Sequence, residues 1–427
     1  MINYNMIDTI LDDLVSYGST IPYRNKLRNQ VIYELKKDLD LNTILNSITD
    51  EVCSFSNDYL NNKNVHSTNV ISGLSTGIYL PDYSDGKADI VIVGGNKSRE
   101  NNNKIDFDTV FDMASITKLY TLLLAFRLEE LGYINLNSKI SCVNSDFKYL
   151  DDYTFNDLIK LYGELRTNGR INDASSIEEA YNILKTVFIV DNDRNKIKYN
   201  DFGSMIISNT IEKIMSQIMG KEMSFDEIMN EFLFKPLNIN NTMYNPKTDN
   251  VSGNGYALCT PHDPKVRLFG GVSGHAGLFS NSSDLMKLSD MLFKNNFLNK
   301  EHKERLCRRI LSNNLRGNMG LFLKDEKGLK VTYNPSELSD YSFTSEGYTG
   351  SIASFDLKNK IHNSILVNAI INDEKTKMIN DKPVGFMEAS DSYQTQLIKN
   401  IMLMYVIKKY YNKYLNVKED IILRRVI

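Results

Sequence analysis

One mostly apolar stretch, residues 119–126, constrains the fold more than any other part of the chain. It lies within the segment 115–131, whose composition predicts a long helix. Asp112 is suited to cap the start of that helix, and Gly132 is suited to the position just after its end. Because the middle of the helix is apolar on nearly every face, other parts of the protein must surround it. The sequence therefore predicts a central, buried helix.

Short β-type runs occur on both sides of a long middle region of helices and loops, 150–300. We expect a hairpin at the edge of a sheet from two early runs, and further strands after residue 318. This order predicts an α/β fold of the α+β type, in which both ends of the chain build one antiparallel sheet and a helical lobe is inserted. The predicted strands are 77–80, 89–93, 320–323, 329–333, 351–355 and 364–368.

The changes in composition divide the chain into three parts. Residues 1–72 are expected to be a helical N-terminal extension and linker, and 73–391 the main domain. Residues 392–427 contain a predicted C-terminal helix, at about 392–414, that packs on the same domain. This helix is basic and amphipathic and could instead lie on a membrane surface, but its broad apolar side favours packing in a core.

Composition excludes several classes of function. The net charge of −3 gives no sign of nucleic-acid binding. No stretch approaches the roughly 20 apolar residues of a membrane span, and the first 13 residues lack the basic start of a signal peptide. We therefore expect a cytoplasmic protein. The four cysteines form no CxxC pair, so their spacing indicates no metal site.

The pattern Ser-x-x-Lys occurs three times, and its context distinguishes one copy. Ser84/Lys87 and Ser145/Lys148 lie in polar, turn-like surroundings, whereas Ser115 and Lys118 begin the predicted buried helix. Residues i and i+3 share a helix face, so the lysine ammonium can reach the serine hydroxyl. Burial favours a neutral lysine, which can accept the serine proton. The alternative is a capping serine beside a lysine whose stem packs on apolar surface.

A Ser-His-Asp triad is the competing chemistry. The one Gly-x-Ser-x-Gly sequence contains Ser75, but a polar loop precedes it where a nucleophile elbow requires a strand. We interpret it as a flexible turn. His275 lies in a glycine-rich run and is expected to shape a loop beside the cleft rather than to catalyse. The His262-Asp263 pair, which lies between two prolines, is typical of a turn.

The sequence Phe-Asp-Met-Ala-Ser-Ile-Thr-Lys-Leu-Tyr at 111–120 resembles the active-serine helix of the serine β-lactamase-like family. That family includes class C β-lactamases, penicillin-binding DD-peptidases and related esterases. Other segments resemble the family in the same order along the chain, including a glycine-rich stretch typical of its penicillin-binding-protein-4-like branch. The resemblance covers about residues 73–375. The further matching segments are 128–138, 154–159, 198–207, 234–242 and 270–280.

The resemblance implies a nucleophile, Ser115, with Lys118 beside it and Tyr199 as a second catalytic group that moves protons. It implies a cleft between the sheet and the helical lobe. Asp201 stands where the family has asparagine. Its carboxylate would keep Lys118 protonated and shift the role of base toward Tyr199. Asp201 could also cap the helix predicted at 202–215.

The family's third motif, a basic residue followed by a hydroxyl residue and glycine, is altered. Ser345 and Glu346 occupy its first two positions, and Gly347, Tyr348 and Thr349 follow. Gly347 lets the strand approach a substrate, and an oxyanion hole would combine the backbone N–H of the nucleophile with that of Tyr348. The positive charge that meets a substrate carboxylate in relatives is lost.

The resemblance therefore implies a serine hydrolase or acyl-transferase. It would act through a covalent acyl-Ser115 intermediate on an ester, amide or peptide substrate. No metal or organic cofactor is implied. The altered third motif keeps open a second interpretation, a non-catalytic protein that uses the same cleft for binding or sensing.

Overall fold

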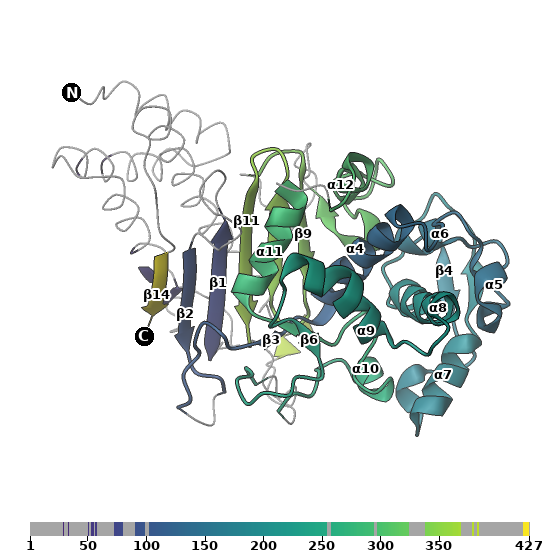
Figure 1. The fold of residues 1–427 in the computed structure, drawn as a ribbon, viewed down its shortest axis with the longest axis horizontal. Coiled ribbons are helices and arrows are strands. Elements are labelled where there is room, and N and C mark those ends of the chain that lie inside the picture. The colour runs from purple at the N-terminus through teal and green to yellow at the C-terminus, as the bar shows by residue number, and fades with distance from the viewer. Residues whose placement is uncertain are drawn as a thin grey trace.

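A central helix, α4 (Thr117–Glu130), lies between a sheet and a lobe of helices in the computed structural model of the chain (Figure 1). The structure describes residues 72–79, 90–98, 102–253, 258–293, 297–323 and 338–368, three short segments after residue 377 and a few positions before residue 58. Every residue from Thr117 to Phe126 is buried. The predicted central, buried helix is therefore confirmed.

The start of this helix differs from the prediction. Ser115 lies in a short 3₁₀ turn, η1 (Ala114–Ile116), and the α-helix begins only at Thr117. The Asp112 carboxylate accepts a hydrogen bond from the Ala114 N–H at 2.9 Å, so the chain turns sharply as it leaves a strand. Ala114 has a φ of 44°, a left-handed conformation that costs of the order of 1–3 kcal/mol for a residue with a side chain. At the other end Gly132 has a φ of 78°, as expected after a helix C-terminus.

Both ends of the described domain contribute to one seven-stranded sheet, in the order β14-β2-β1-β11-β10-β9-β8. The early strand β1 pairs antiparallel with the late strand β11, as the sequence predicted. The early hairpin does not form the edge, because β14 adds a further strand parallel to β2. The strands are β1 (Gly73–Tyr79), β2 (Ile90–Gly95), β8 (Phe322–Leu323), β9 (Ser342–Glu346), β10 (Ile352–Asp356), β11 (Ile361–Val367) and β14 (Ile422–Val426).

Ser75 lies inside a strand, and the prediction of a flexible turn there is wrong. β1 begins at Gly73, four residues earlier than predicted, because the run from Gly73 pairs on both sides, with β2 and β11. Ser75 is 1% exposed and its hydroxyl lies 2.8 Å from the hydroxyl of Ser282. It is a buried polar residue of the sheet, which does not suit a nucleophile.

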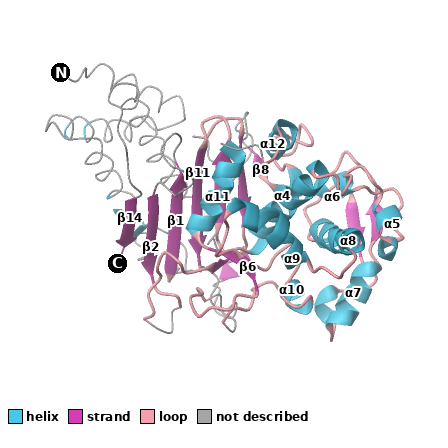
Figure 2. Ribbon diagram, viewed as in Figure 1, coloured by secondary structure: helices cyan, strands magenta, loops and turns pink. Residues whose placement is uncertain are grey.

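Helices form a lobe on the far side of α4 from the sheet, as Figure 2 shows. The longest is α8 (Phe202–Met219), which extends four residues beyond the predicted end. A three-stranded sheet in the order β3-β7-β6 leads into η1, and α11 (Ser282–Phe293) packs on β1 and β11. The remaining lobe elements are α5 (Ile140–Val143), α6 (Phe155–Ile159), β4 (Glu164–Arg166), α7 (Ile177–Lys185), β5 (Phe188–Asp191) and α9 (Phe225–Met229). The others are β3 (Phe111–Asp112), β6 (Met243–Tyr244), α10 (Pro264–Leu268), β7 (Leu278–Ser280), α12 (Lys300–Leu306), η6 (Asn318–Gly320), β12 (Met378–Ile379) and β13 (Lys382–Pro383).

Some predicted elements lie outside the described residues. These are most of the N-terminal extension 1–72, the strand 329–333 and the C-terminal helix at about 392–414. In the described part of the chain, no helix combines the length and the apolar composition that crossing a membrane requires. The antiparallel sheet with helices and an inserted lobe is confirmed.

A buried histidine in the sheet makes the stability of the fold depend on pH. His362, in β11, has no exposed surface, and its ring stacks on Phe355 with 4.1 Å between ring centroids. Its Nδ1 donates a hydrogen bond to the carbonyl of Ser354 at 2.9 Å. Burial lowers the pKa of His362 from 6.5 to about 3, against the opposing effect of that hydrogen bond. The imidazole is therefore neutral in the folded protein at ordinary pH.

Between pH 6.5 and about 3, the unfolded chain binds a proton at His362 that the folded chain does not. The free energy of unfolding should therefore fall as the pH falls through this window, by up to about 1.4 kcal/mol per pH unit. We predict that His362→Gln removes this part of the slope. Urea unfolding of both proteins at pH 4.5, 5.5 and 7 measures it, and equal slopes would contradict the prediction.

Candidate active site

Ser115 and Lys118 are in direct contact. The Lys118 ammonium donates a hydrogen bond to Ser115 Oγ at 2.9 Å and another to the backbone carbonyl of His275 at 3.1 Å. Lys118 is only 2% exposed, because α4 is covered on all sides. In the second Ser-x-x-Lys copy within the described residues, Ser145 instead accepts a weak bond from Lys213 at 3.5 Å. Of these two copies, only Ser115 and Lys118 bring their own serine and lysine into contact, as their place at the start of the buried helix suggested.

Asp201 supplies the counter-charge that Lys118 needs. Its Oδ1 lies 2.9 Å from Lys118 Nζ. Burial lowers the pKa of Lys118, but the charge of Asp201, together with Tyr199, more than offsets burial and holds that pKa above its ordinary value. Burial likewise raises the pKa of Asp201, yet Lys118, His275 and Lys265 hold it well below its usual range. The pair is therefore an ammonium and a carboxylate at neutral pH.

The interpretation of Asp201 as a side-chain cap is wrong. Asp201 does occupy the residue before α8, but its carboxylate makes no capping hydrogen bond. The preceding Asn200 performs that role, since its Oδ1 accepts a hydrogen bond from the Gly203 N–H at 3.1 Å. Because Asn200 caps the helix, the carboxylate of Asp201 is available to pair with Lys118.

Tyr199 also lies beside Lys118, and it is 39% exposed. The centre of its ring is 5.1 Å from Lys118 Nζ and 4.6 Å from the guanidinium carbon of Arg316. Gly320, in η6, packs so closely on the ring that a Cβ at this position would collide with it. The tyrosine ring is thus held by two cations and remains partly exposed.

The altered third motif packs against the segment that precedes Ser115. β9 ends at Glu346, and a Cβ at Gly347 would collide with the carbonyl of Met113, just before the turn that carries the serine. Tyr348 is 54% exposed, whereas Thr349 is buried and its hydroxyl donates to the carbonyl of Asp112 at 2.8 Å. The motif therefore presses directly on the segment that leads to Ser115.

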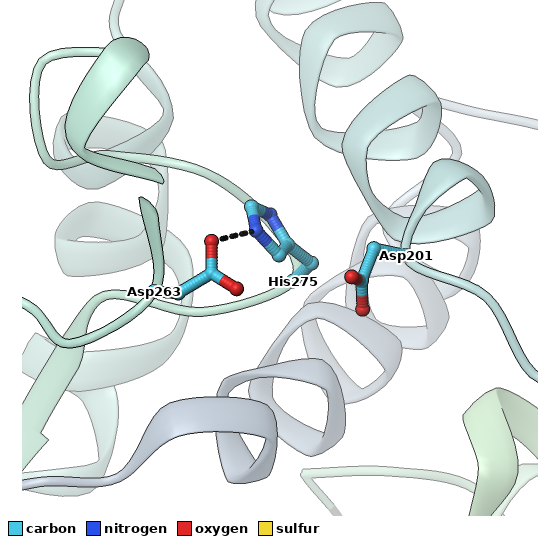
Figure 3. Close-up of side chains that lie close together, drawn as sticks. All are labelled: Asp201, Asp263 and His275. Atoms are coloured by element: carbon cyan, nitrogen blue, oxygen red, sulfur yellow. Dashed lines mark hydrogen bonds and ion pairs between the residues drawn. The ribbon is translucent and has the colours of Figure 1, made fainter. Parts of the chain in front are cut away.

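Asp201 also belongs to a second cluster of polar and charged groups, together with Asp263, His275 and Lys265. Figure 3 shows the imidazole of His275 between Asp263 and Asp201, with its Nε2 3.0 Å from Asp263 Oδ1. One ligand atom from each of these three residues lies within 4.8 Å of the others, a spacing that suits a metal ion. However, Lys265 Nζ lies 3.0 Å from Asp201 Oδ2 and 3.7 Å from Asp263 Oδ2. Because an ammonium bridges the two carboxylates, we interpret the cluster as an ion-pair network.

The histidine predictions can be compared with this geometry. His275 does shape the loop beside Lys118, through its carbonyl, and its ring is tied to Asp263 and to the Ser273 hydroxyl. The turn predicted at His262-Asp263 begins α10, where Asp263 accepts hydrogen bonds from the N–H groups of Lys265 and Val266.

Three features of the site were not predicted from the sequence. They are Lys265, the pairing of Asp263 with His275, and Arg316, which stacks on Tyr199. A separation of 12 positions in irregular chain gives no periodic signal for the Asp263–His275 pair. A lysine directly after Asp-Pro in a turn was the one weak indication available.

A cavity of about 650 Å³ lies elsewhere, at the C-terminal end of α4. It contains a buried histidine, His302, with its Nε2 2.9 Å from a carboxylate oxygen of Glu129. Because Ser115 is at the opposite end of that helix, this cavity is separate from the candidate site. Other lining residues are Asn156, Lys160, Arg305 and Arg309.

Comparisons with known proteins agree with this architecture. Residues 68–379 match the family described as Beta-lactamase. An N-acetylmuramyl-L-alanine amidase from Bacillus subtilis is 27% identical over 242 residues, covering 46% of this chain and 53% of the amidase. A putative D-alanyl-D-alanine carboxypeptidase from Salmonella agona is 25% identical over 229 residues, covering 43% and 51%. The chain thus spans about half the length of these curated relatives.

Solved structures share the fold at low sequence identity. EstCE1, a hydrolase with promiscuous acyltransferase activity, has a TM-score of 0.59 at 16% identity and covers 84% of this chain and 98% of its own. A class C beta-lactamase has a TM-score of 0.59 at 13% identity, covering 87% and 98%. The octameric penicillin-binding protein homologue from Pyrococcus abyssi has a TM-score of 0.58 at 17% identity, covering 86% and 82%. The family match over most of the chain is decisive: this protein belongs to the beta-lactamase family.

Proposed function

We propose that this protein is a serine hydrolase or acyl-transferase that forms a covalent acyl-Ser115 intermediate on an ester, amide or peptide substrate. The observation that carries the proposal is the contact between Lys118 Nζ and Ser115 Oγ, with Asp201 as the third partner. A buried cation aimed at a serine hydroxyl stabilises negative charge on that oxygen during attack. The proposed substrate is a small molecule or a peptide.

In the proposed acylation step, Ser115 Oγ attacks the carbonyl carbon of the substrate, and its proton passes to the hydroxyl oxygen of Tyr199. The hydroxyl proton of Tyr199 passes at the same time to the leaving group, whose bond to the carbonyl carbon breaks, so Tyr199 ends the step unchanged. Lys118 is the stabilising cation in this scheme, not the base, because Asp201 keeps it protonated. Water or another acceptor then attacks the acyl-serine and releases the acid or the transfer product.

The oxyanion that forms during attack needs two hydrogen-bond donors. The backbone N–H groups of Ser115 and Tyr348 are the proposed pair. The close approach of Gly347 to Met113 supports this assignment, because it brings the two chain segments together.

The names of the relatives are consistent with acyl transfer in this family. They include an amidase, a putative D-alanyl-D-alanine carboxypeptidase and a hydrolase with acyltransferase activity. The competing proposal is a non-catalytic binding or sensor protein, and the missing cation at Ser345 and Glu346 is the feature that favours it.

We predict that Ser115→Ala abolishes covalent labelling of the purified protein by a fluorophosphonate probe, because the nucleophile is lost. Lys118→Met should slow labelling by roughly 100-fold or more, since the stabilising cation is lost. Mass spectrometry of the intact protein measures both effects.

Ser145→Ala is the matched control, because Ser145 belongs to another Ser-x-x-Lys sequence on the surface. Its labelling should equal that of the wild type. Undiminished labelling of Ser115→Ala would remove Ser115 from the role of nucleophile, and an unlabelled wild type that binds ligands in the cleft would favour the sensor.

We predict that Gly347→Ala slows the same labelling reaction by about 100-fold or more, because its Cβ would displace the segment before Ser115. Gly169→Ala is the control, since a Cβ there meets no atom closer than 3.9 Å. Equal rates for Gly347→Ala and the wild type would show that the third motif does not press on the serine.

We predict weak or absent β-lactamase activity. Ser345 and Glu346 provide no cation for the carboxylate of a β-lactam, and Glu346 adds a negative charge at that wall. Spectrophotometric turnover of a chromogenic cephalosporin tests this expectation. Efficient turnover, comparable with that of dedicated β-lactamases, would contradict it.

A further inference from the structure

We infer that Lys265 is a positioning residue of the acylation site, which holds the outer oxygen of Asp201 and thereby fixes the carboxylate that orients Lys118 toward Ser115. This inference rests on the proposed function. Neither hydrophobic periodicity nor a known motif indicates Lys265, and its proposed role follows from where α10 places it.

The two oxygens of Asp201 are divided between two lysines. Oδ1 lies 2.9 Å from Lys118 Nζ, and Oδ2 lies 3.0 Å from Lys265 Nζ. A carboxylate that is held at both oxygens cannot rotate about its terminal bond without losing one ion pair. Lys118 is therefore directed by an anchored partner, and its remaining hydrogen bonds go to Ser115 and to the carbonyl of His275.

The backbone of Lys265 is itself held in place by a hydrogen bond. It lies in the first turn of α10, where the Asp263 carboxylate accepts its backbone N–H at 2.8 Å. The same carboxylate is bonded to the ring of His275, whose carbonyl contacts Lys118. Lys265 is about 25% exposed, so its charge is partly shielded from water. Lys265 thus links Asp201 to Asp263, and Asp263 is linked through His275 back to Lys118.

The Lys265 ammonium occupies a place near two carboxylates where a metal ion could otherwise bind. It lies 3.0 Å from Asp201 Oδ2 and 3.7 Å from Asp263 Oδ2, and these two carboxylates flank the ring of His275 (Figure 3). Without the Lys265 ammonium, Asp263 would keep only its side-chain contact with His275, and Asp201 would keep Lys118 but lose the partner of its Oδ2. Removal of the ammonium should therefore loosen Asp201 and leave a site that favours an added cation.

The test uses the full chain and the rate of Ser115 labelling by the fluorophosphonate probe. Lys265→Ala should slow labelling between about 10- and 100-fold. Lys265→Arg should retain most of the rate, because its guanidinium can bind the same carboxylates. Added propylammonium should accelerate Lys265→Ala, whereas propanol should not, since only the former restores the charge.

Lys213→Ala is the matched control, because Lys213 is also partly buried, at 32% exposure, and also pairs with an aspartate, Asp146, but lies in α8 away from Asp201 and Lys118. Its labelling rate should not change. An unchanged rate in Lys265→Ala overturns the inference. So does a loss that neither Lys265→Arg nor propylammonium restores, because that pattern indicates a merely structural role.

A second measurement separates this inference from the proposed function. If the wild type is neither labelled nor able to hydrolyse a neutral p-nitrophenyl ester, the proposed function fails. Calorimetric titration with Mn²⁺ still tests Lys265: the Lys265→Ala variant should bind one ion where the wild type binds none. A folded Lys265→Ala protein that binds no Mn²⁺ would show that the ammonium does not occupy a cation position.

Discussion

The charge of Lys118 is the constraint around which this structure is organised. An ammonium that is 2% exposed must be paired, because an unpaired charge in the interior is too costly to keep. Its partners come from three parts of the chain, namely η1, the start of α8 and the loop before β7. Segments that are far apart in the sequence therefore meet around one electrostatic centre, beside the partly exposed Tyr199.

The parts of the fold that follow from periodicity and burial could be predicted from the sequence. The apolar stretch in the middle of α4 required a central helix, and the strands at both ends of the domain required a shared sheet. The contact of Ser115 with Lys118 followed from their spacing, although the serine lies in a 3₁₀ turn. That turn depends on the Asp112 carboxylate, which the sequence indicates as a cap, and on the left-handed conformation of Ala114, which no residue pattern indicates.

The parts that depend on irregular chain could not be predicted. Lys265, Asp263 and His275 meet because a short helix and a glycine-rich loop fold against the start of α8. Neither hydrophobic periodicity nor motif spacing specifies such a meeting. Asp201 illustrates the same limit. Its position before a helix indicated a side-chain cap, but its carboxylate pairs with two lysines, and Asn200 caps the helix instead.

The joining of the two ends of the domain in one sheet has a consequence for synthesis. The N–H of Gly73 donates to the side chain of Asn368, and these residues are 295 positions apart. β1 therefore has no partner on its β11 side until nearly the whole domain has left the ribosome. The elements of the lobe, whose contacts are closer along the chain, can form earlier. The segment that carries Gly347 is then added after a lobe that already holds Tyr199 and Asp201.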